Sequence, residues 1–302
     1  MGSPPFGLVF CMSLNFLIGV FIAIAGTLGG FVFEGGHLGV LAEAAPVEIA
    51  IMGGTAAAAF VISNPPAVKR ATGKALKLLF KKQKFTKESY IELLSLMYQI
   101  FKLAKTKGML ALEAHVEKPE ESSVFQAFPG FLHNHHAVEF FCDYLRLFTL
   151  GADKPYEIEA LMDEELEVHH AQNESVSAAI QNIADGMPAI GIVAAVLGVI
   201  HTMGAISEPP EVLGRLIGSA LVGTFMGVWT SYGFIGPVGT YLKQTLEAES
   251  KYLQCLKVGM VAHLQGFAPS ISIEYARKSL LAEVRPTFME VEEATQALTA
   301  PT

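Results

Sequence analysis

The sequence predicts an all-α integral membrane protein, with four transmembrane helices and an α-helical cytoplasmic domain inserted between the second and third helices. Three observations support this fold class. Of 302 residues, 51% are hydrophobic and only 17% are charged, which is too apolar for an ordinary soluble domain. Four apolar stretches are long enough to cross a bilayer core of about 30 Å. No segment alternates between apolar and polar residues as a half-buried strand would.

The four apolar stretches are residues 8–28, 46–63, 187–206 and 212–242. Because they occur as two close pairs, we expect two transmembrane hairpins, at 1–63 and 187–242. The first hairpin would have an outer loop at about 34–45. Residues 64–186 would form the cytoplasmic helical domain, and 243–302 a cytoplasmic C-terminal helix and tail.

Basic residues fix the orientation. All Lys and Arg residues except Arg215 fall in two segments, 69–154 and 243–285, which follow the second and fourth spans. By the positive-inside rule these ends of the spans, and hence both termini, are cytoplasmic. The first segment opens with a cluster that we expect to contact anionic membrane lipids. This basic cluster comprises Lys69, Arg70, Lys74, Lys77, Lys81, Lys82, Lys84 and Lys87.

Composition and motifs also exclude several function classes. The net charge of -8 gives no support for nucleic-acid binding. The chain has no phosphate-binding loop and no dinucleotide-binding glycine motif after a strand, and its Ser, His and Asp residues form no local nucleophile signature. We therefore expect neither an enzyme nor a cofactor.

The cytoplasmic domain should consist of helices. Apolar residues recur at helical spacing in 87–109, a second helix should cover about 135–150, and a third should begin after Pro155. Residues 244–264 are amphipathic, and 276–281 is a shorter helical candidate. We expect the second and third spans to continue as helices beyond the membrane.

The polar clusters of this domain contain residue types that could bind a metal. Glu167 and His170 form one Glu-x-x-His unit, and a di-metal carboxylate site needs that unit twice with two further carboxylates. Because only one copy occurs, we interpret the cluster as a solvated acidic helix face and expect no metal. The upstream polar residues are His133, His135, His136 and Glu139.

Small residues line the third and fourth spans. Gly191 and Gly198 lie in the third span, and Gly223 and Gly227 in the fourth. In lipid such residues let helices approach closely, because van der Waals packing replaces the hydrophobic drive. They could serve a partner helix, or they could pack the two spans on each other.

Each of these spans also carries a proline near its cytoplasmic end. Pro188 and Pro237 each free a backbone carbonyl, which then needs a substitute partner such as a side chain or water. We expect a kinked, hydrated cytoplasmic mouth with Asp185 beside it. We also expect no carboxylate at the middle of any span, since Glu48 falls at the outer end of the second. On that basis the chain by itself lacks a proton relay within the membrane.

Three stretches closely resemble the MotA family of flagellar stator subunits, within the wider group that includes TolQ and ExbB: residues 188–201, residues 222–237 and the soluble run 157–165. The resemblance implies a homo-oligomeric ring in the bacterial inner membrane. It also implies a MotB-like partner, anchored to peptidoglycan, that contributes a membrane Asp. The function implied is a proton channel that drives flagellar rotation.

The resemblance also assigns roles to residues. The prolines matched by Pro188 and Pro237 couple ion flow to motion, and the threonine matched by Thr224 lines the ion path. Sodium-driven relatives have threonine where this chain has Ala195, and loss of that oxygen ligand favours H+ over Na+. Lys105 and Glu113 match charges that contact the rotor protein FliG.

Two other classes remain open. One is a proton-driven energiser of outer-membrane transport like ExbB or TolQ, which has three spans and differently placed termini. The other is a passive membrane scaffold or a metal-binding membrane protein.

Overall fold

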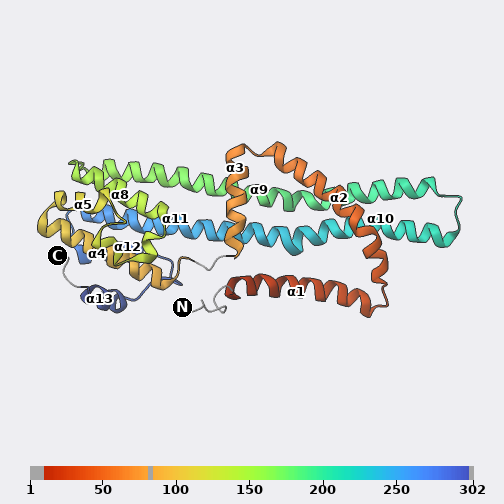
Figure 1. Ribbon diagram of the computed structural model, residues 1–302, viewed down its shortest axis with the longest axis horizontal. Helices are drawn as coiled ribbons and strands as arrows, with labels where there is room; N and C mark the ends of the chain where they lie inside the picture. Colours follow the sequence, from red (N-terminus) through yellow and green to blue (C-terminus); the bar gives the residue numbers. More distant parts are fainter. Residues whose placement is uncertain (1–9, 81–83, 299–302) are drawn as a thin grey trace. The chain divides into compact units, whose positions relative to one another are not determined.

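A computed structural model describes residues 10–80 and 84–298 of the protein (Figure 1). Within these residues the secondary structure is helical and contains no strand, so the all-α prediction is confirmed. Lys81 and Lys82 of the basic cluster lie outside the described residues.

The chain divides into two compact units. The division falls between residues 82 and 83, between 171 and 172, and between 245 and 246. We call the described residues 10–80 and 172–245 the hairpin unit, and 84–171 with 246–298 the body.

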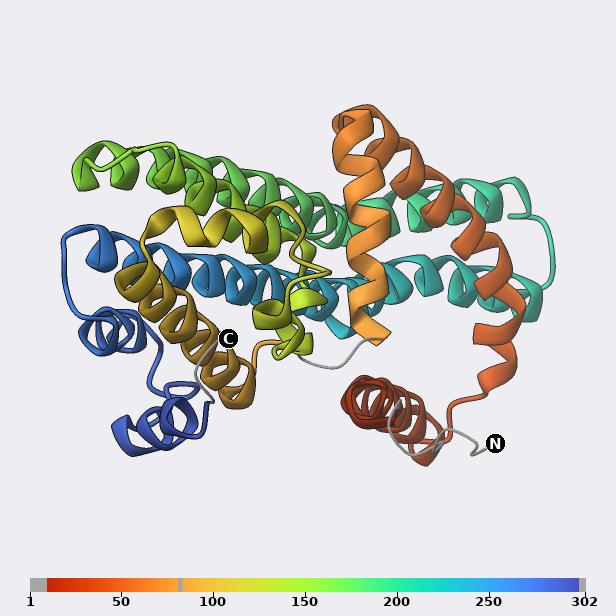
Figure 2. The same cartoon turned by 60° about the vertical axis from the view of Figure 1, so that its left-hand side comes forward.

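The hairpin unit contains all four helices that are long and apolar enough to cross a membrane. Its elements are α1 (Phe10–Phe33), α2 (Leu38–Ser63), α3 (Pro66–Ala75), a 3-10 turn (Leu76–Phe80), the second part of α9 (Pro155–Gly204), α10 (Pro210–Thr230), a π-helical segment (Ser231–Ile235) and the start of α11 (Gly236–Leu264). The second part of α9 and helix α10 lie side by side in both views (Figures 1 and 2).

The side chains of these helices are arranged as lipid requires. Large apolar side chains point away from the neighbouring helices: Phe21 is 70% exposed and Ile200 is 62% exposed. Small residues such as Ala194 and Ala220 are buried instead. Exposed apolar area on this scale marks a surface that water does not cover, which agrees with four bilayer-spanning helices.

Two helix boundaries differ from the sequence expectations. Helix α2 begins at Leu38 and contains Pro46, so only residues 34–37 separate it from α1. The expectation that the second span continues as a helix is wrong, because Asn64 and Pro65 are extended and α3 starts at Pro66. Residues before a proline avoid the α conformation, and two consecutive prolines break the helix here. The corresponding expectation for the third span is confirmed, since α9 is a single helix of 50 residues.

The body is built around the first part of α9 and the remainder of α11. Its other elements are α4 (Lys87–Lys107), a 3-10 turn (Met109–Leu112), α5 (Glu113–Glu117), α6 (Ser123–Gln126), α7 (Pro129–Leu132), α8 (His135–Thr149), α12 (Pro269–Lys278) and α13 (Phe288–Gln296). The predicted helices at 87–109 and 135–150 thus correspond to α4 and α8. The short helix expected at 276–281 starts earlier, because Pro269 occupies its first turn, where no N–H is needed.

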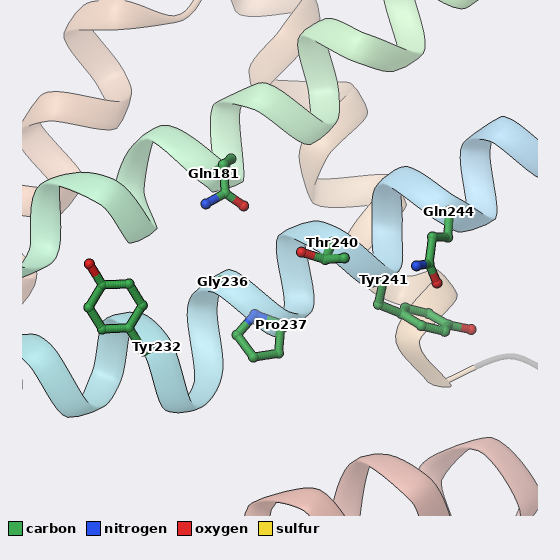
Figure 3. Close-up of a pocket in the computed structure, with 7 residues that line it drawn as sticks. All are labelled: Gln181, Tyr232, Gly236, Pro237, Thr240, Tyr241 and Gln244. Atoms are coloured by element: carbon green, nitrogen blue, oxygen red, sulfur yellow. The ribbon is translucent and has the colours of Figure 1, made fainter.

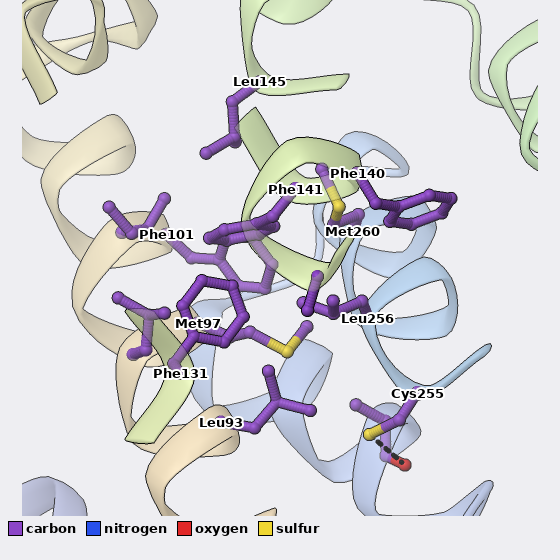
Figure 4. Packing of buried hydrophobic residues seen from close by; sticks show 14 of the residues in the cluster. Leu93, Met97, Phe101, Phe131, Phe140, Phe141, Leu145, Cys255, Leu256 and Met260 are labelled. Atoms are coloured by element: carbon purple, nitrogen blue, oxygen red, sulfur yellow. Dashed lines mark hydrogen bonds between the residues drawn. The ribbon is translucent and has the colours of Figure 1, made fainter. Parts of the chain in front are cut away.

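One hydrophobic core holds the body together (Figure 4). Phe131 and Phe141 are fully buried and meet edge to face, with ring centroids 5.9 Å apart. Met97 of α4 and Leu256 of α11 fill the same core. Burial of each such side chain contributes about 1.5–3 kcal/mol, so the body has its own source of stability. Cys255 is a free thiol in this core, and its Sγ donates to the carbonyl of Ala276.

Candidate functional site

The prediction that the carbonyl freed by Pro188 needs a substitute donor is confirmed. Pro188 has no N–H to offer the carbonyl of Ala184, one turn earlier in α9. The hydroxyl of Ser231 donates to that carbonyl instead, at 2.5 Å. Ser231 and Ala184 are each 1% exposed. A single hydrogen bond therefore links the proline-interrupted part of α9 to the residue that opens the π-helical segment after α10.

The second proline sits beside this π-helical segment. Pro237 follows Ser231–Ile235 and is the second residue of α11. A π-helical turn inside an otherwise α-helical run interrupts the regular hydrogen-bond ladder and often marks a functional position. The fourth span is therefore irregular at the same level at which α9 carries Pro188.

An open groove of about 500 Å³ lies at this level. Its walls come from α9 and from the segment around Pro237, and Figure 3 shows Gln181 facing the Gly236 and Thr240 side of the groove. The lining residues are Gln181, Tyr232, Gly236, Pro237, Thr240, Tyr241 and Gln244. Asp185, expected beside a polar mouth, is exposed and accepts a hydrogen bond from Gln181 at 2.8 Å. Gln181, Thr240 and Gln244 thus bring polar groups to the groove with which water can form hydrogen bonds.

The four glycines of the small-residue stripe pack α9 on α10. A Cβ placed on Gly191 would lie 2.7 Å from the carbonyl oxygen of Gly223 and 2.9 Å from Cα of Gly227. A Cβ on Gly198 would lie 2.7 Å from Cβ of Ala220. These separations are shorter than any real contact. The glycines therefore serve the contact between the two helices of the second hairpin. Their packing against a partner helix stays a prediction.

The residues that the resemblance assigns to the ion path fall at two levels. Ala195 is 8% exposed, and its backbone nitrogen lies 3.0 Å from the place a Cβ on Gly223 would occupy. Thr224 follows directly in α10 and is half-buried. Pro188 precedes Ala195 by seven residues, or about 10 Å of helix. The structure thus brings Ala195 near the Gly223–Thr224 pair and places the two prolines further along the hairpin.

A buried carboxylate corrects one sequence expectation. The sequence places Glu48 at the outer end of the second span, but this residue lies ten residues into α2 from Leu38, or about 15 Å along the helix. Its side chain is among the buried polar ones, and its Oε2 would lie 2.6 Å from a Cβ on Gly223. Among the described residues Oε2 has no hydrogen-bond partner. A carboxyl group is therefore present in the middle of these helices.

Ser231 and Glu48 are the two site residues that sequence reasoning missed. The carbonyl left without a partner by Pro188 was visible in the sequence, but its donor lies 47 residues beyond Ala184, and no local signal identifies it. The position of Glu48 along its helix was predicted wrongly because the apolar stretch starts at Pro46, whereas the helix starts at Leu38.

The expected rotor-contact residues lie in the body. Lys105 is exposed near the end of α4, which stops at Gly108 because that residue adopts a φ of +87°. Glu113 is exposed and opens α5. Within the described chain neither residue takes part in an ion pair, so both charges are available at the surface.

Comparison with known proteins places the chain in a family. Residues 17–108 match the family described as "Motility protein A N-terminal", and residues 133–255 match the "MotA/TolQ/ExbB proton channel family". The chain is 41% identical to Motility protein A of Salmonella typhimurium, over 94% of this chain and 96% of that protein. It is 40% identical to Motility protein A of Escherichia coli over the same shares of both chains.

A solved structure agrees with these sequence matches. The flagellar MotAB stator complex from Bacillus subtilis contains a chain that resembles this one with a TM-score of 0.68 and 26% identity, covering 90% of this chain and 98% of that one. The sequence identity, the coverage and the shared fold lead to one conclusion. The chain belongs to the MotA family of motility proteins.

Proposed function

We propose that the chain is a stator subunit of the bacterial flagellar motor. Together with a MotB-like subunit anchored to peptidoglycan, it forms a proton-conducting channel and converts proton flow into torque on the rotor. It is a multi-pass protein of the inner membrane with both termini in the cytoplasm. Several copies form a ring around the partner's transmembrane helices, and the basic cluster around Lys69–Lys77 binds anionic lipids.

One observation supports this proposal above all: two proline-interrupted helices joined at one level by the Ser231–Ala184 hydrogen bond. Packed helices with an interrupted ladder can adopt discrete arrangements, which is what a conformational coupling element needs. Because α9 is one continuous helix, about 50 Å of helix separates Pro188 from the helix start at Pro155, along which a change at the proline would be carried. That length matches the task of passing motion from the membrane to the cytoplasmic body.

The conducted ion is H+ in this proposal. Protonation of the partner's membrane Asp, held near Ala195 and Thr224, changes the local charge and drives rotation or tilting of the ring. Each proton that crosses supplies about 2.3 kcal/mol per 100 mV. The absence of a hydroxyl at Ala195 removes an oxygen ligand that a hard cation such as Na+ would use.

Torque passes to the rotor protein FliG through Lys105 and Glu113. Both side chains are exposed in the body, as contact residues must be. Lys105 offers a point charge rather than the planar fork of arginine, so its contact would depend on charge more than on geometry.

A swimming assay tests the coupling role. Cells that carry Pro188→Ala or Pro237→Ala should lose motility although the protein accumulates normally. Pro210→Ala is the matched control, because a proline in the first turn of a helix replaces no hydrogen bond and its loss should leave motility unchanged. Normal swimming by both variants, at normal protein levels, would refute the coupling role.

The same cells distinguish the rival functions. An energiser of outer-membrane transport would show a loss of uptake rather than of swimming, and the four candidate spans already differ from its three. A passive scaffold would give no proton leak when co-expressed with the partner. Swimming speed measured against sodium concentration and against a protonophore identifies the ion.

A further inference from the structure

Three side chains with metal-binding atoms converge in the body from three different helices. His136 belongs to α8, His169 to α9 and Glu249 to α11, and one ligand atom from each lies within 4.8 Å of the others. Nδ1 of His136 is 3.5 Å from Oε1 of Glu249. The two imidazole rings meet edge to face with centroids 5.9 Å apart. This cluster shares no residue with the ion path or with the expected rotor contact.

The helices that carry the cluster are held in register by two contacts on one side of it. The hydroxyl of Tyr144 in α8 donates to Glu165 of α9 at 2.7 Å. Lys257 of α11 forms an ion pair with Asp163 of α9 at 2.6 Å. Neither link uses a residue of the cluster. The convergence of the three side chains is therefore a property of the helix packing, which is the rigid support that a metal site requires.

The chemistry of the donor set selects one class of ion. Two imidazole nitrogens and one carboxylate are the protein ligands of many zinc sites, with a fourth position open to water. Imidazole favours zinc and its neighbours in the first transition row, whereas Ca²⁺ and Mg²⁺ prefer oxygen ligands throughout.

The distances are compatible with coordination after a small adjustment. Ligand atoms around a tetrahedral zinc ion lie about 3.4 Å apart, given metal–ligand distances of about 2.0–2.2 Å. The His136–Glu249 separation of 3.5 Å already meets this requirement. The side chain of His136 is 63% exposed, so it can rotate to close the remaining distance.

We propose that His136, His169 and Glu249 bind one divalent transition-metal ion of the zinc class. The ion ties α8 to α9 and α11, and its binding stabilises the folded body by mass action. The site differs from the Glu167 and His170 pair of the sequence motif, since neither of those residues belongs to the cluster.

Metal titration of the purified chain with its partner subunit tests this inference. The complex is purified through an affinity tag without histidine, stripped with a chelator, and titrated with Zn²⁺ by calorimetry. Co²⁺ serves as a spectroscopic probe, because its visible absorption reports the coordination geometry. We expect one ion per chain and a rise in the melting temperature. His136→Ala and Glu249→Gln should each weaken binding at least about tenfold, since the loss of a residue that only supports a metal ligand already costs about that much.

His135→Ala is the matched control, because His135 is an exposed imidazole in the same turn of α8 but lies outside the cluster. This variant should bind as tightly as the parent. Equal affinities for the parent and for His136→Ala would overturn the inference, and so would the absence of one-to-one binding at micromolar Zn²⁺. Motility plays no part in this measurement, so its outcome is independent of the proposed motor function.

Discussion

The contact between α9 and α10 can be tested at Gly227, where the structure leaves no room for a side chain. A Cβ at this position would lie 2.8 Å from Cα of Gly191 and 2.8 Å from the carbonyl oxygen of Met187. Both atoms belong to the backbone of α9, so no flexible side chain can turn away. Gly227→Ala must therefore push the two helices apart or strain one of them.

The expected cost is the balance of two opposing effects. Inserting a methyl group into a well-packed contact costs about 1–3 kcal/mol. Alanine also gains up to about 1 kcal/mol over glycine in a helix. Gly214→Ala in the same helix is the matched control, because a Cβ there meets no atom within 4 Å. Since both variants gain the helix preference, they should differ by the cost of overpacking alone, about 1–3 kcal/mol.

Unfolding of the purified chain in mixed micelles, driven by increasing amounts of a denaturing detergent, measures this difference. Trp229 is the only tryptophan of the chain and lies two residues from Gly227. Its indole donates to the hydroxyl of Thr27 in α1 at 3.1 Å, so its fluorescence reports local packing. If Gly227→Ala proved as stable as Gly214→Ala, the close approach of the two helices would be wrong.

Two further predictions concern a hydrogen bond and a buried histidine. Ser231→Ala leaves the buried carbonyl of Ala184 without its donor, and we expect about 1–3 kcal/mol of destabilisation in the same unfolding assay. Ser231→Thr keeps a hydroxyl and should retain most of the stability. If Ser231→Ala were as stable as the parent chain, the hydrogen bond would contribute nothing to stability. His263 stacks on Phe101, and burial, aided by nearby Lys105, lowers its pKa to about 4 from an ordinary value near 6.5. Between these two pH values the unfolded chain binds a proton that the folded chain does not, so stability falls as pH decreases from about 6.5 to about 4, by up to about 3 kcal/mol. Thermal melts across this pH range should show a smaller decrease for His263→Gln, and an unchanged decrease would contradict the assignment to His263.

The sequence was sufficient to predict the order of helices because hydrophobic length and charge are local properties. Four apolar stretches coincide with four long helices, and helical spacing located α4 and α8. The double proline at 65–66 was also visible, yet the second span was expected to continue through it. The helix ends there because a residue that precedes a proline avoids the α conformation, and both Asn64 and Pro65 precede one.

Contacts between distant segments could not be predicted in the same way. The pattern of small residues indicated a close helix contact but left its partner open, and only the backbone geometry assigns Gly191 and Gly227 to each other. Likewise, Pro188 in the sequence indicates a carbonyl without a hydrogen-bond donor. Which residue donates to that carbonyl depends on how α10 and the π-helical segment after it pack against α9. A single sequence can show that a backbone group or a helix face needs a partner, but it does not show which distant residue is that partner.

Glu48 illustrates the error that arises when a span is defined by hydropathy alone. Counting from Pro46 places this carboxyl at the outer end of the span, whereas counting from the helix start at Leu38 places it ten residues, or about 15 Å, along α2. An unpaired charge there is costly, and the absence of a Cβ at Gly223 provides the space that the carboxyl occupies. The chain therefore contributes a carboxyl of its own beside the residue that precedes Thr224. A partner that supplies a membrane Asp would then add a second acidic group to this region, and the role of each group has to be separated by substituting Glu48 and the partner's acid independently.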